Sequence, residues 1–535
     1  MSNTQWWQTG IIYQIYVRSF CDSNGDGIGD LQGVISKLDY LKDLGVAGIW
    51  LSPITVSANA DWGYDVVDYY SIDPHLGSMA DFDQLIAETA KRGIKVLIDM
   101  VPNHTSIHHP WFQSALIGRD SEYRDYYIWA DPKPGGGPPS NWRSMFGGSA
   151  WSYHRPTHQY FLHNFLPEQA DLNWRNPMVK AEFDRIFKFW LGKGVCGFRI
   201  DVFNMLIKDQ LFRDNPEANN DEGYEVKLLG QEPIYTTSRP ELHRILRHWR
   251  QIVDKNGPGR LLLGETTMVY DMHQLAAFYG THNELELAFN FAFLQSKFRA
   301  RDLRRLVEET EAVIKSPDWP VWTGSNHDQP RFPSRWARAD ERKIRCGLLM
   351  LLTLRGTPVL YYGDEIGMED TLVMPWRLQD SVGKRLWPLY TGRDKARTPM
   401  PWQSGPGAGF TSPDTKPWLP IGWAAHRNVE AQAAGSDSTL RFTRDVIAYR
   451  NQTADLQTGA YQSLPSPGRV WAYLRGSKTA VFINFSNLKI TLDGVAGQVQ
   501  LSTIRGEEGA QLLGELKLAP WHGVVVHLEG RPPSY

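Results

Sequence analysis

The feature that most constrains the fold is an alternation of short apolar runs with amphipathic helical stretches along most of the chain. The runs are rich in β-branched and aromatic residues, and between them apolar residues recur at helical spacing, as Leu31, Val34, Leu38 and Leu41 do. This order is typical of a parallel sheet with crossover helices. Eight such runs can be counted, at 11–17, 47–53, 95–101, 195–202, 260–265, 285–291, 320–325 and 357–363.

Eight strand and helix units predict an α/β fold, a (β/α)8 TIM barrel with insertions rather than a doubly wound open sheet. The segment after the third run is rich in Gly, Pro and aromatic residues and shows no helical period, which indicates an excursion domain over the barrel mouth. Near the end, alternating runs such as VWAYLRG and GVVVHLE predict an antiparallel β domain. We expect the barrel at 1–103 and 175–455, the excursion domain at 104–174 and the C-terminal domain at 456–535.

Composition excludes several function classes. The formal net charge of −2 gives no field that would recruit nucleic acid, and no stretch of about 18 apolar residues would span a membrane. The three cysteines show no CxxC spacing, and the start of the chain lacks the pattern of a signal peptide. We therefore expect a cytoplasmic protein, monomeric or a small homo-oligomer, with no nucleic-acid or membrane partner. The 21 Trp and 22 Tyr residues suit sugar rings as well as cores.

Acidic residues lie at the ends of four of the runs, where a TIM barrel places its chemistry. Any one of them could simply cap the next helix. Several carboxylates at one barrel mouth beside an Arg would instead be costly without a function, because each raises the pKa of the others. The reaction that needs one carboxylate and one carboxylic acid is glycoside hydrolysis. The acids are Asp99, Asp201 (two residues after Arg199), Glu265 and Asp328.

A short acidic loop, CDSNGDGIGDLQG, follows the first run and offers oxygen ligands at the spacing of a calcium loop. A sensor loop of the EF-hand type needs a Glu at its twelfth position, which here is Gly33, so a calcium switch is excluded. An ion-free turn is the alternative interpretation. The oxygens available to a hard cation are those of Asp22, Asn24, Asp26, Asp30 and the Ile28 carbonyl.

Four stretches in this order, DMVPNH, GFRIDVF, GETT and SNHD, resemble the four sequence regions of the α-amylase family of glycoside hydrolases. QADLNW at 169–174 is similar to an additional region of the branch that contains oligo-1,6-glucosidase, dextran glucosidase and α-glucosidase. The resemblance covers essentially the whole chain. It implies the barrel, excursion domain and C-terminal β domain expected above, small α-glucosides as substrates, and a structural calcium ion in the acidic loop.

The resemblance also implies the two-step mechanism of retaining glycosidases. Asp201 would be the nucleophile of a β-glucosyl-enzyme intermediate, and Glu265 the general acid that becomes the base of the second step, with their carboxyls about 5–5.5 Å apart. Asp328 would hold sugar hydroxyls and favour the distorted ring. We expect Arg199 to keep Asp201 ionised, whereas Glu265 needs a raised pKa to remain a proton donor.

Further residues match positions that hold the substrate in this family. Asp61 and Arg397 match the pair that closes the pocket behind the non-reducing glucose, which would make the enzyme exo-acting; an ordinary salt bridge is the alternative. A branched residue after the nucleophile, here Val202, accompanies α-1,6 preference, by a margin of about 1–3 kcal/mol. The remaining pocket residues would be Tyr64, stacked on the ring, His104 and His327, bound to hydroxyls, and Phe146 and Phe165 on the walls.

Several functions are compatible with these motifs. The expected one is a retaining exo-acting α-glucosidase that releases glucose from short α-glucosides, with a preference for α-1,6 linkages and with transglucosylation as a side reaction. The alternatives are an α-1,4-preferring α-glucosidase or glucosyl transferase, a trehalose-6-phosphate hydrolase, and a non-catalytic binding module. The binding modules of this family lose acids of the triad, whereas all three are present here.

Overall fold

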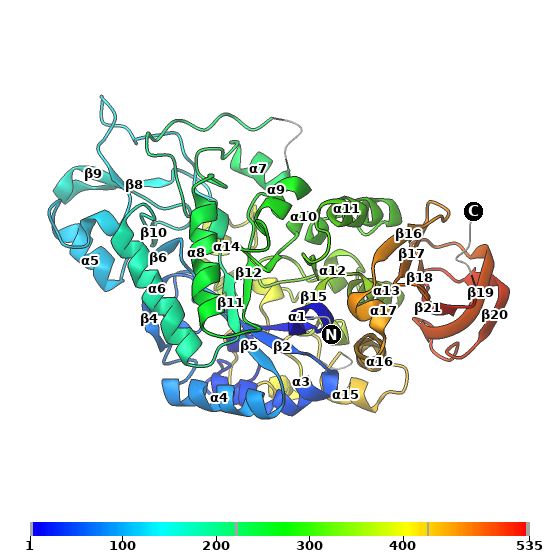
Figure 1. Ribbon diagram of the computed structural model, residues 1–535. Helices are drawn as coiled ribbons and strands as arrows, with labels where there is room; N and C mark the ends of the chain where they lie inside the picture. The colour runs from blue at the N-terminus through cyan, green and yellow to red at the C-terminus, as the bar shows by residue number, and fades with distance from the viewer. Residues whose placement is uncertain (1–3, 220–222, 425–426, 531–535) are drawn as a thin grey trace.

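Eight parallel strands form a barrel in the computed structural model, which describes residues 4–219, 223–424 and 427–530 (Figure 1). The hydrogen-bonded order is β13-β12-β11-β5-β2-β1-β15-β14, and a parallel bridge between Phe289 and Val321 brings the two edges together. The predicted fold class is confirmed, and each apolar run contains one strand. The strands are β1 (Ile12–Ile15), β2 (Gly48–Leu51), β5 (Lys95–Met100), β11 (Gly197–Ile200), β12 (Leu261–Gly264), β13 (Leu287–Ala288), β14 (Val321–Thr323) and β15 (Thr357–Tyr361).

The register of the central strands determines which polar residues meet at the barrel mouth. Arg199 on β11 is paired with Asp99 on β5, and the ladder continues past the strand ends: Asp201 N–H donates to the Met100 carbonyl at 2.8 Å, and Glu265 N–H to the Ile200 carbonyl at 2.9 Å. Because neighbouring parallel strands end on the same rim, these side chains converge there.

Helices surround the barrel, and their apolar faces pack on the strands. Asp30 caps the helix after β1 by accepting from the Gly33 N–H, and the residues predicted at helical spacing, Leu31, Val34, Leu38 and Leu41, are buried there. These helices are α2 (Leu31–Ser36), α3 (Leu38–Leu44), α4 (Met79–Lys91), α6 (Pro177–Gly192), α8 (Leu242–Lys255), α11 (Ala300–Val313), α13 (Glu341–Thr353) and α16 (Thr439–Gln452).

Shorter helices lie in the connecting segments. Within the described residues, none of the helices is both long and apolar enough to cross a membrane. The short helices are α1 (Trp6–Thr9), α5 (Pro110–Ile117), α7 (Tyr224–Leu229), α9 (Met272–Ala277), α10 (Phe291–Leu294), α12 (Phe332–Arg335), α14 (Ser381–Leu386), α15 (Val429–Ala434) and α17 (Ala454–Thr458).

Small antiparallel sheets are inserted into the barrel connections. Between β5 and β11, strand β6 (His104–Ser106) pairs with β10 (Gln169–Asp171), and a separate three-stranded sheet packs around buried Trp142 and Trp151. Figure 1 shows this insertion at one end of the molecule, in cyan. The other inserted strands are β7 (Trp129–Ala130), β8 (Trp151–His154) and β9 (Gln159–Leu162), and, before β5, β3 (Thr55–Ser57) and β4 (Val66–Ile72).

A six-stranded antiparallel sheet forms the opposite end of the molecule, drawn in orange to red in Figure 1. Tyr473 joins it to the barrel helices through a hydroxyl hydrogen bond of 2.6 Å with Thr353 on α13, and Arg475 lies fully buried at the same contact. The strands are β16 (Tyr461–Leu464), β17 (Val470–Arg475), β18 (Thr479–Asn484), β19 (Ile490–Ser502), β20 (Gln511–Leu518) and β21 (Gly523–Leu528).

Candidate active site

One buried arginine connects three acids at the barrel mouth. Arg199 Nη1 donates to Asp99 Oδ1 at 2.7 Å and to Asp201 Oδ1 at 2.8 Å, and its Nη2 lies 2.5 Å from Glu265 Oε2. All four side chains are at most 8% exposed. Burial raises the pKa of Asp99 to about 7 against the attraction of Arg199. The predicted meeting of Asp99, Asp201 and Glu265 around Arg199 is therefore present, in a site from which water is largely excluded.

The carboxyls of Asp201 and Glu265 lie next to each other and interact directly. Burial raises the pKa of Asp201 well above its usual value in spite of Arg199, and both the charge of Glu265 and a hydrogen bond with it raise that pKa further. Arg199 lowers the pKa of Asp201 as expected, but burial and Glu265 outweigh it in the free protein. Glycoside cleavage needs one carboxylate and one carboxylic acid, and two carboxyls on one guanidinium can take these two roles.

The turn after the nucleophile candidate has an unusual backbone. Val202 has φ 32° and ψ 41°, a left-handed conformation that β-branched residues rarely adopt. The turn directs the Val202 N–H at Glu265 Oε2, 3.2 Å away. The side chain of Val202 packs with Phe165 and Met205, and Phe146 contacts Phe165 with ring centroids 5.5 Å apart. The expected wall residues Phe146, Phe165 and Val202 are thus gathered in one apolar cluster beside the acids.

Asp328 lies in the loop after β14 and is held by cations. Its Oδ1 accepts from Arg397 Nη2 at 2.8 Å and from Arg393 Nη1 at 3.2 Å, and its Oδ2 lies 3.1 Å from His327 Nε2. Burial raises the pKa of Asp328, but His327, Arg393 and Arg397 outweigh this and hold the pKa well below its usual range. With 29% of its side chain exposed, Asp328 remains an ionised acceptor open to the pocket.

The partner expected for Asp61 is corrected. Asp61 Oδ1 pairs with Arg393 Nη2 at 2.5 Å, whereas Arg397 donates to the His327 carbonyl and to Asp328. Arg393 also binds Asp380, its Nη2 at 2.8 Å from Oδ1, so this one guanidinium links three acids. Burial raises the pKa of Asp61 to about 6 against Arg393 and Arg397. The sequence reasoning missed Arg393 and Asp380; two arginines four positions apart in RDKAR were the available signal.

The side chains of Tyr64 and His327 belong to a buried chain of hydrogen bonds that ends at Asp99. The Gln14 amide lies 2.8 Å from His327 Nδ1, which leaves the ring proton on Nε2, 2.5 Å from the Tyr64 hydroxyl; that hydroxyl donates to Asp99 Oδ2 at 3.1 Å. The Tyr64 and His327 rings are stacked at 5.3 Å. Burial lowers the pKa of His327 to about 3, so its ring is neutral.

His104 is also neutral and engaged with the protein. Its Nε2 lies 3.0 Å from the Tyr64 carbonyl and 3.0 Å from the amide nitrogen of Gln169, its Nδ1 lies 3.1 Å from the Asn103 amide, and burial lowers its pKa to about 4. Both histidine rings are therefore engaged with protein groups, and their hydrogen bonds to sugar hydroxyls stay a prediction. Either ring would have to exchange a protein contact for a hydroxyl when substrate binds.

The acidic loop after β1 is held by its own side chains. Asp22 accepts from the Asn24, Gly25 and Gly27 N–H groups, and Asp30 accepts from the Ser23 and Gly33 N–H groups. In the described part of the chain, no three His, Cys, Asp or Glu side chains are already gathered as a metal site. The donor chemistry suits a hard cation, and the Asn24 and Asp26 side chains remain exposed to solvent, but the four expected side-chain ligands are arranged as turn-forming acceptors.

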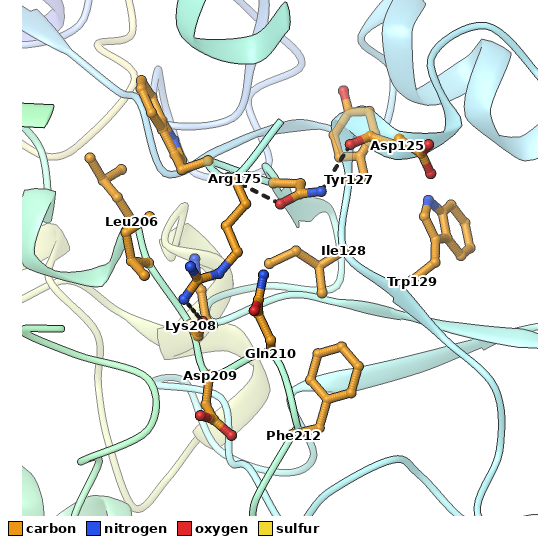
Figure 2. Close-up of a pocket in the computed structure, with 13 residues that line it drawn as sticks. Asp125, Tyr127, Ile128, Trp129, Arg175, Leu206, Lys208, Asp209, Gln210 and Phe212 are labelled. Carbon is orange, nitrogen blue, oxygen red and sulfur yellow. Dashed lines mark hydrogen bonds between the residues drawn. The ribbon is translucent and has the colours of Figure 1, made fainter. Parts of the chain in front are cut away.

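A separate cavity of about 320 Å³ lies between the inserted segment and the chain that follows the β11 turn (Figure 2). Arg175 crosses it and donates to the Lys208 carbonyl at 3.0 Å, and Trp129, Gln210 and Phe212 contribute to its walls. None of the three catalytic candidates lines it.

The comparisons with known proteins agree with this geometry. A family model of the α-amylase catalytic domain matches residues 14–459. The chain therefore belongs to the α-amylase family of glycoside hydrolases, and within it to the branch of α-glucosidases and oligo-1,6-glucosidases.

Three relatives illustrate the similarity. The chain is 38% identical to trehalose-6-phosphate hydrolase of Escherichia coli, over 90% of this chain and 91% of that one. It is 35% identical to oligo-1,6-glucosidase of Parageobacillus thermoglucosidasius, over 97% and 98% of the two chains. The crystal structure of the α-glucosyl transfer enzyme XgtA superposes with a TM-score of 0.92 at 38% identity and covers 98% of this chain and 100% of that one. An α-glucosidase-type enzyme is the class that the fold and its relatives define.

Proposed function

We propose that the protein is a retaining, exo-acting α-glucosidase that releases glucose from the non-reducing end of short α-glucosides. The observation that carries the proposal is the pair of buried carboxyls of Asp201 and Glu265, which both bind the guanidinium of Arg199. Asp328, ionised and partly open, lies beside this pair at the same mouth. A carboxylate, a carboxylic acid and a second carboxylate for hydroxyls are what a retaining mechanism uses.

In the first step Asp201 attacks the anomeric carbon while Glu265 gives its proton to the departing glycosidic oxygen. Arg199 favours the anionic form of Asp201 for this attack, and Glu265 must carry the proton that it gives away. In the second step Glu265 takes a proton from water, which attacks the glucosyl ester and restores the α configuration. Asp328 accepts hydrogen bonds from ring hydroxyls throughout, and its low pKa keeps it ionised for this role.

The closed end of the pocket makes the action exo. Asp61 and Arg393, joined at 2.5 Å and buried, offer a carboxylate and a guanidinium to the terminal hydroxyls of the non-reducing glucose. A longer chain could not continue past this ion pair without separating it. The Phe146 ring lies over Arg393, 5.2 Å from its guanidinium carbon, and adds an apolar wall at the same end.

For the linkage we propose a preference for α-1,6 over α-1,4 bonds, based on the branched side chain of Val202 beside the acids. Transfer of glucose to a second sugar competes with hydrolysis, in line with the similarity to the α-glucosyl transfer enzyme XgtA. Cleavage of trehalose-6-phosphate is the second candidate, supported by the E. coli relative. Arg385 on α14 supports it as well, because its guanidinium reaches the Gly147 carbonyl of the inserted segment at 3.5 Å and could meet a phosphate.

We also propose that the loop of Asp22 to Asp30 takes up calcium as a structural ion outside the chemistry. The ion would neutralise three carboxylates and fasten the loop that precedes α2. A chelator is then expected to lower the melting temperature more than the rate at moderate temperature, and added Ca²⁺ should restore it. A melting temperature that responds to neither chelator nor Ca²⁺ would contradict this part of the proposal.

The purified protein should be incubated with isomaltose, maltose, sucrose, trehalose and trehalose-6-phosphate while glucose release is followed. We expect isomaltose to be cleaved fastest. Faster cleavage of maltose would overturn the linkage assignment, and faster cleavage of trehalose-6-phosphate would favour the second candidate. No turnover of any of the five would refute the α-glucosidase proposal.

A further inference from the structure

Two loops that carry the catalytic pair are tied together by a buried asparagine. Asn204 lies in the short turn Phe203–Met205, directly after Val202, and is 1% exposed. Its Oδ1 accepts from the Thr267 N–H at 3.1 Å, and its Nδ2 donates to the Thr267 carbonyl at 2.8 Å. The side-chain amide of Asn204 therefore satisfies both backbone polar groups of Thr267, which lies two residues after Glu265.

The backbone of Asn204 is itself anchored. Its carbonyl accepts from the Ser238 N–H at 2.6 Å, on a segment that precedes α8. The left-handed turn at Val202 brings the Val202 N–H to Glu265 Oε2. The loop after Asp201 therefore contacts Glu265 directly through Val202 and contacts the loop that follows it, at Thr267, through Asn204. These contacts tie Glu265 and the loop after it to the turn that follows Asp201.

The loop after Glu265 has few other attachments. The Thr266 hydroxyl donates to the Phe289 carbonyl at 2.8 Å, and the Met268 N–H to Glu225 Oε2 at 3.2 Å. Thr267, between them, is held at its backbone by Asn204. Asn is suited to this position because Asp lacks the donor and Leu, of similar shape, lacks both groups.

We infer that Asn204 is a positioning residue that holds the Glu265 carboxyl at the distance and angle needed to protonate the leaving group. The inference rests on the proposed function, because it assigns Asn204 to the general acid of that reaction. A properly placed general acid is worth about 10²–10⁴-fold in rate, so a small displacement of Glu265 should be costly when the leaving group needs its proton.

The test is the dependence of kcat/KM on the leaving group, since this ratio reports only the steps up to the glucosyl-enzyme. Asn204→Leu should lower kcat/KM for the best disaccharide at least about tenfold more than for α-glucosyl fluoride, because the fluoride ion departs without a proton. The alkaline limb of the disaccharide pH profile should also move. If Asn204→Leu does not fold, Asn204→Ser, which is smaller and polar, serves for the same comparison.

Asn428→Leu is the matched control, since Asn428 is equally buried and also bonds two backbone groups, the Ala431 N–H and the Ala424 carbonyl, both at 2.7 Å. Its loss should affect the melting temperature but leave the ratio between the two substrates unchanged. An equal loss on both substrates in Asn204→Leu would overturn the inference and leave the proposed function intact. Failure of the wild-type protein to cleave any α-glucoside would instead refute the proposed function.

Discussion

The buried ion pair of Lys208 and Asp171 allows a quantitative prediction about how the inserted segment is held to the barrel. Lys208 Nζ lies 2.6 Å from Asp171 Oδ2 and donates to Asn103 Oδ1 at 2.8 Å, and the Lys208 and Asp171 side chains are 2% and 0% exposed. Among the described residues, Lys208 is the only partner of Asp171 Oδ2. Lys208→Met would leave a buried carboxylate uncompensated, which costs about 3–5 kcal/mol.

Urea unfolding followed by tryptophan fluorescence would measure this loss. The double variant Lys208→Met/Asp171→Asn should recover at least half of it, because a neutral amide removes the unpaired charge. A loss below about 1 kcal/mol, or a double variant no more stable than the single one, would refute the reasoning.

Two further predictions concern acid stability and the pocket. Burial lowers the pKa of His109 from 6.5 to about 4, so its contribution to stability is present above pH 6.5 and lost as the pH falls toward 4; between pH 7 and pH 5 this amounts to about 2 kcal/mol. His109→Asn, which keeps an acceptor for the Trp111 N–H, should flatten the unfolding free energy over this range, and an unchanged pH slope would contradict the assignment. Arg393→Met should lower kcat/KM by about 100-fold or more by freeing Asp61 and weakening the hold on Asp328. A much smaller loss in Arg393→Met than in Arg397→Met would show that Arg393 does not close the pocket.

The barrel and its acids could be predicted because they follow from short-range pattern. Apolar runs of six to eight residues can be recognised locally, and the acids that end them share a rim once the strands are parallel. Asp99, Asp201 and Glu265 meet at Arg199 for this reason. The helix residues around Leu31 and Leu38 follow from the same periodicity.

Contacts made by irregular segments could not be predicted in this way. Arg393 lies on the long connection after β15, where no periodicity fixes the direction of a side chain, so whether Arg393 or Arg397 meets Asp61 is decided only by the tertiary path. The left-handed backbone of Val202 was equally inaccessible, because a β-branched residue argues against it. The raised pKa of Asp201 likewise depends on burial and on the neighbouring charges rather than on residue type.

The central claim is that Asp201 attacks and Glu265 protonates. It can be tested most directly by following the anomeric form of the first glucose released by proton NMR, together with trapping of the glucosyl-enzyme by a fluorinated α-glucosyl fluoride and mass analysis of the labelled peptide. We predict α-glucose as the first product and a label on Asp201. The substitution Asp201→Asn should abolish the labelling while the protein stays folded. β-Glucose as the first product, or a label on any other residue, would contradict it.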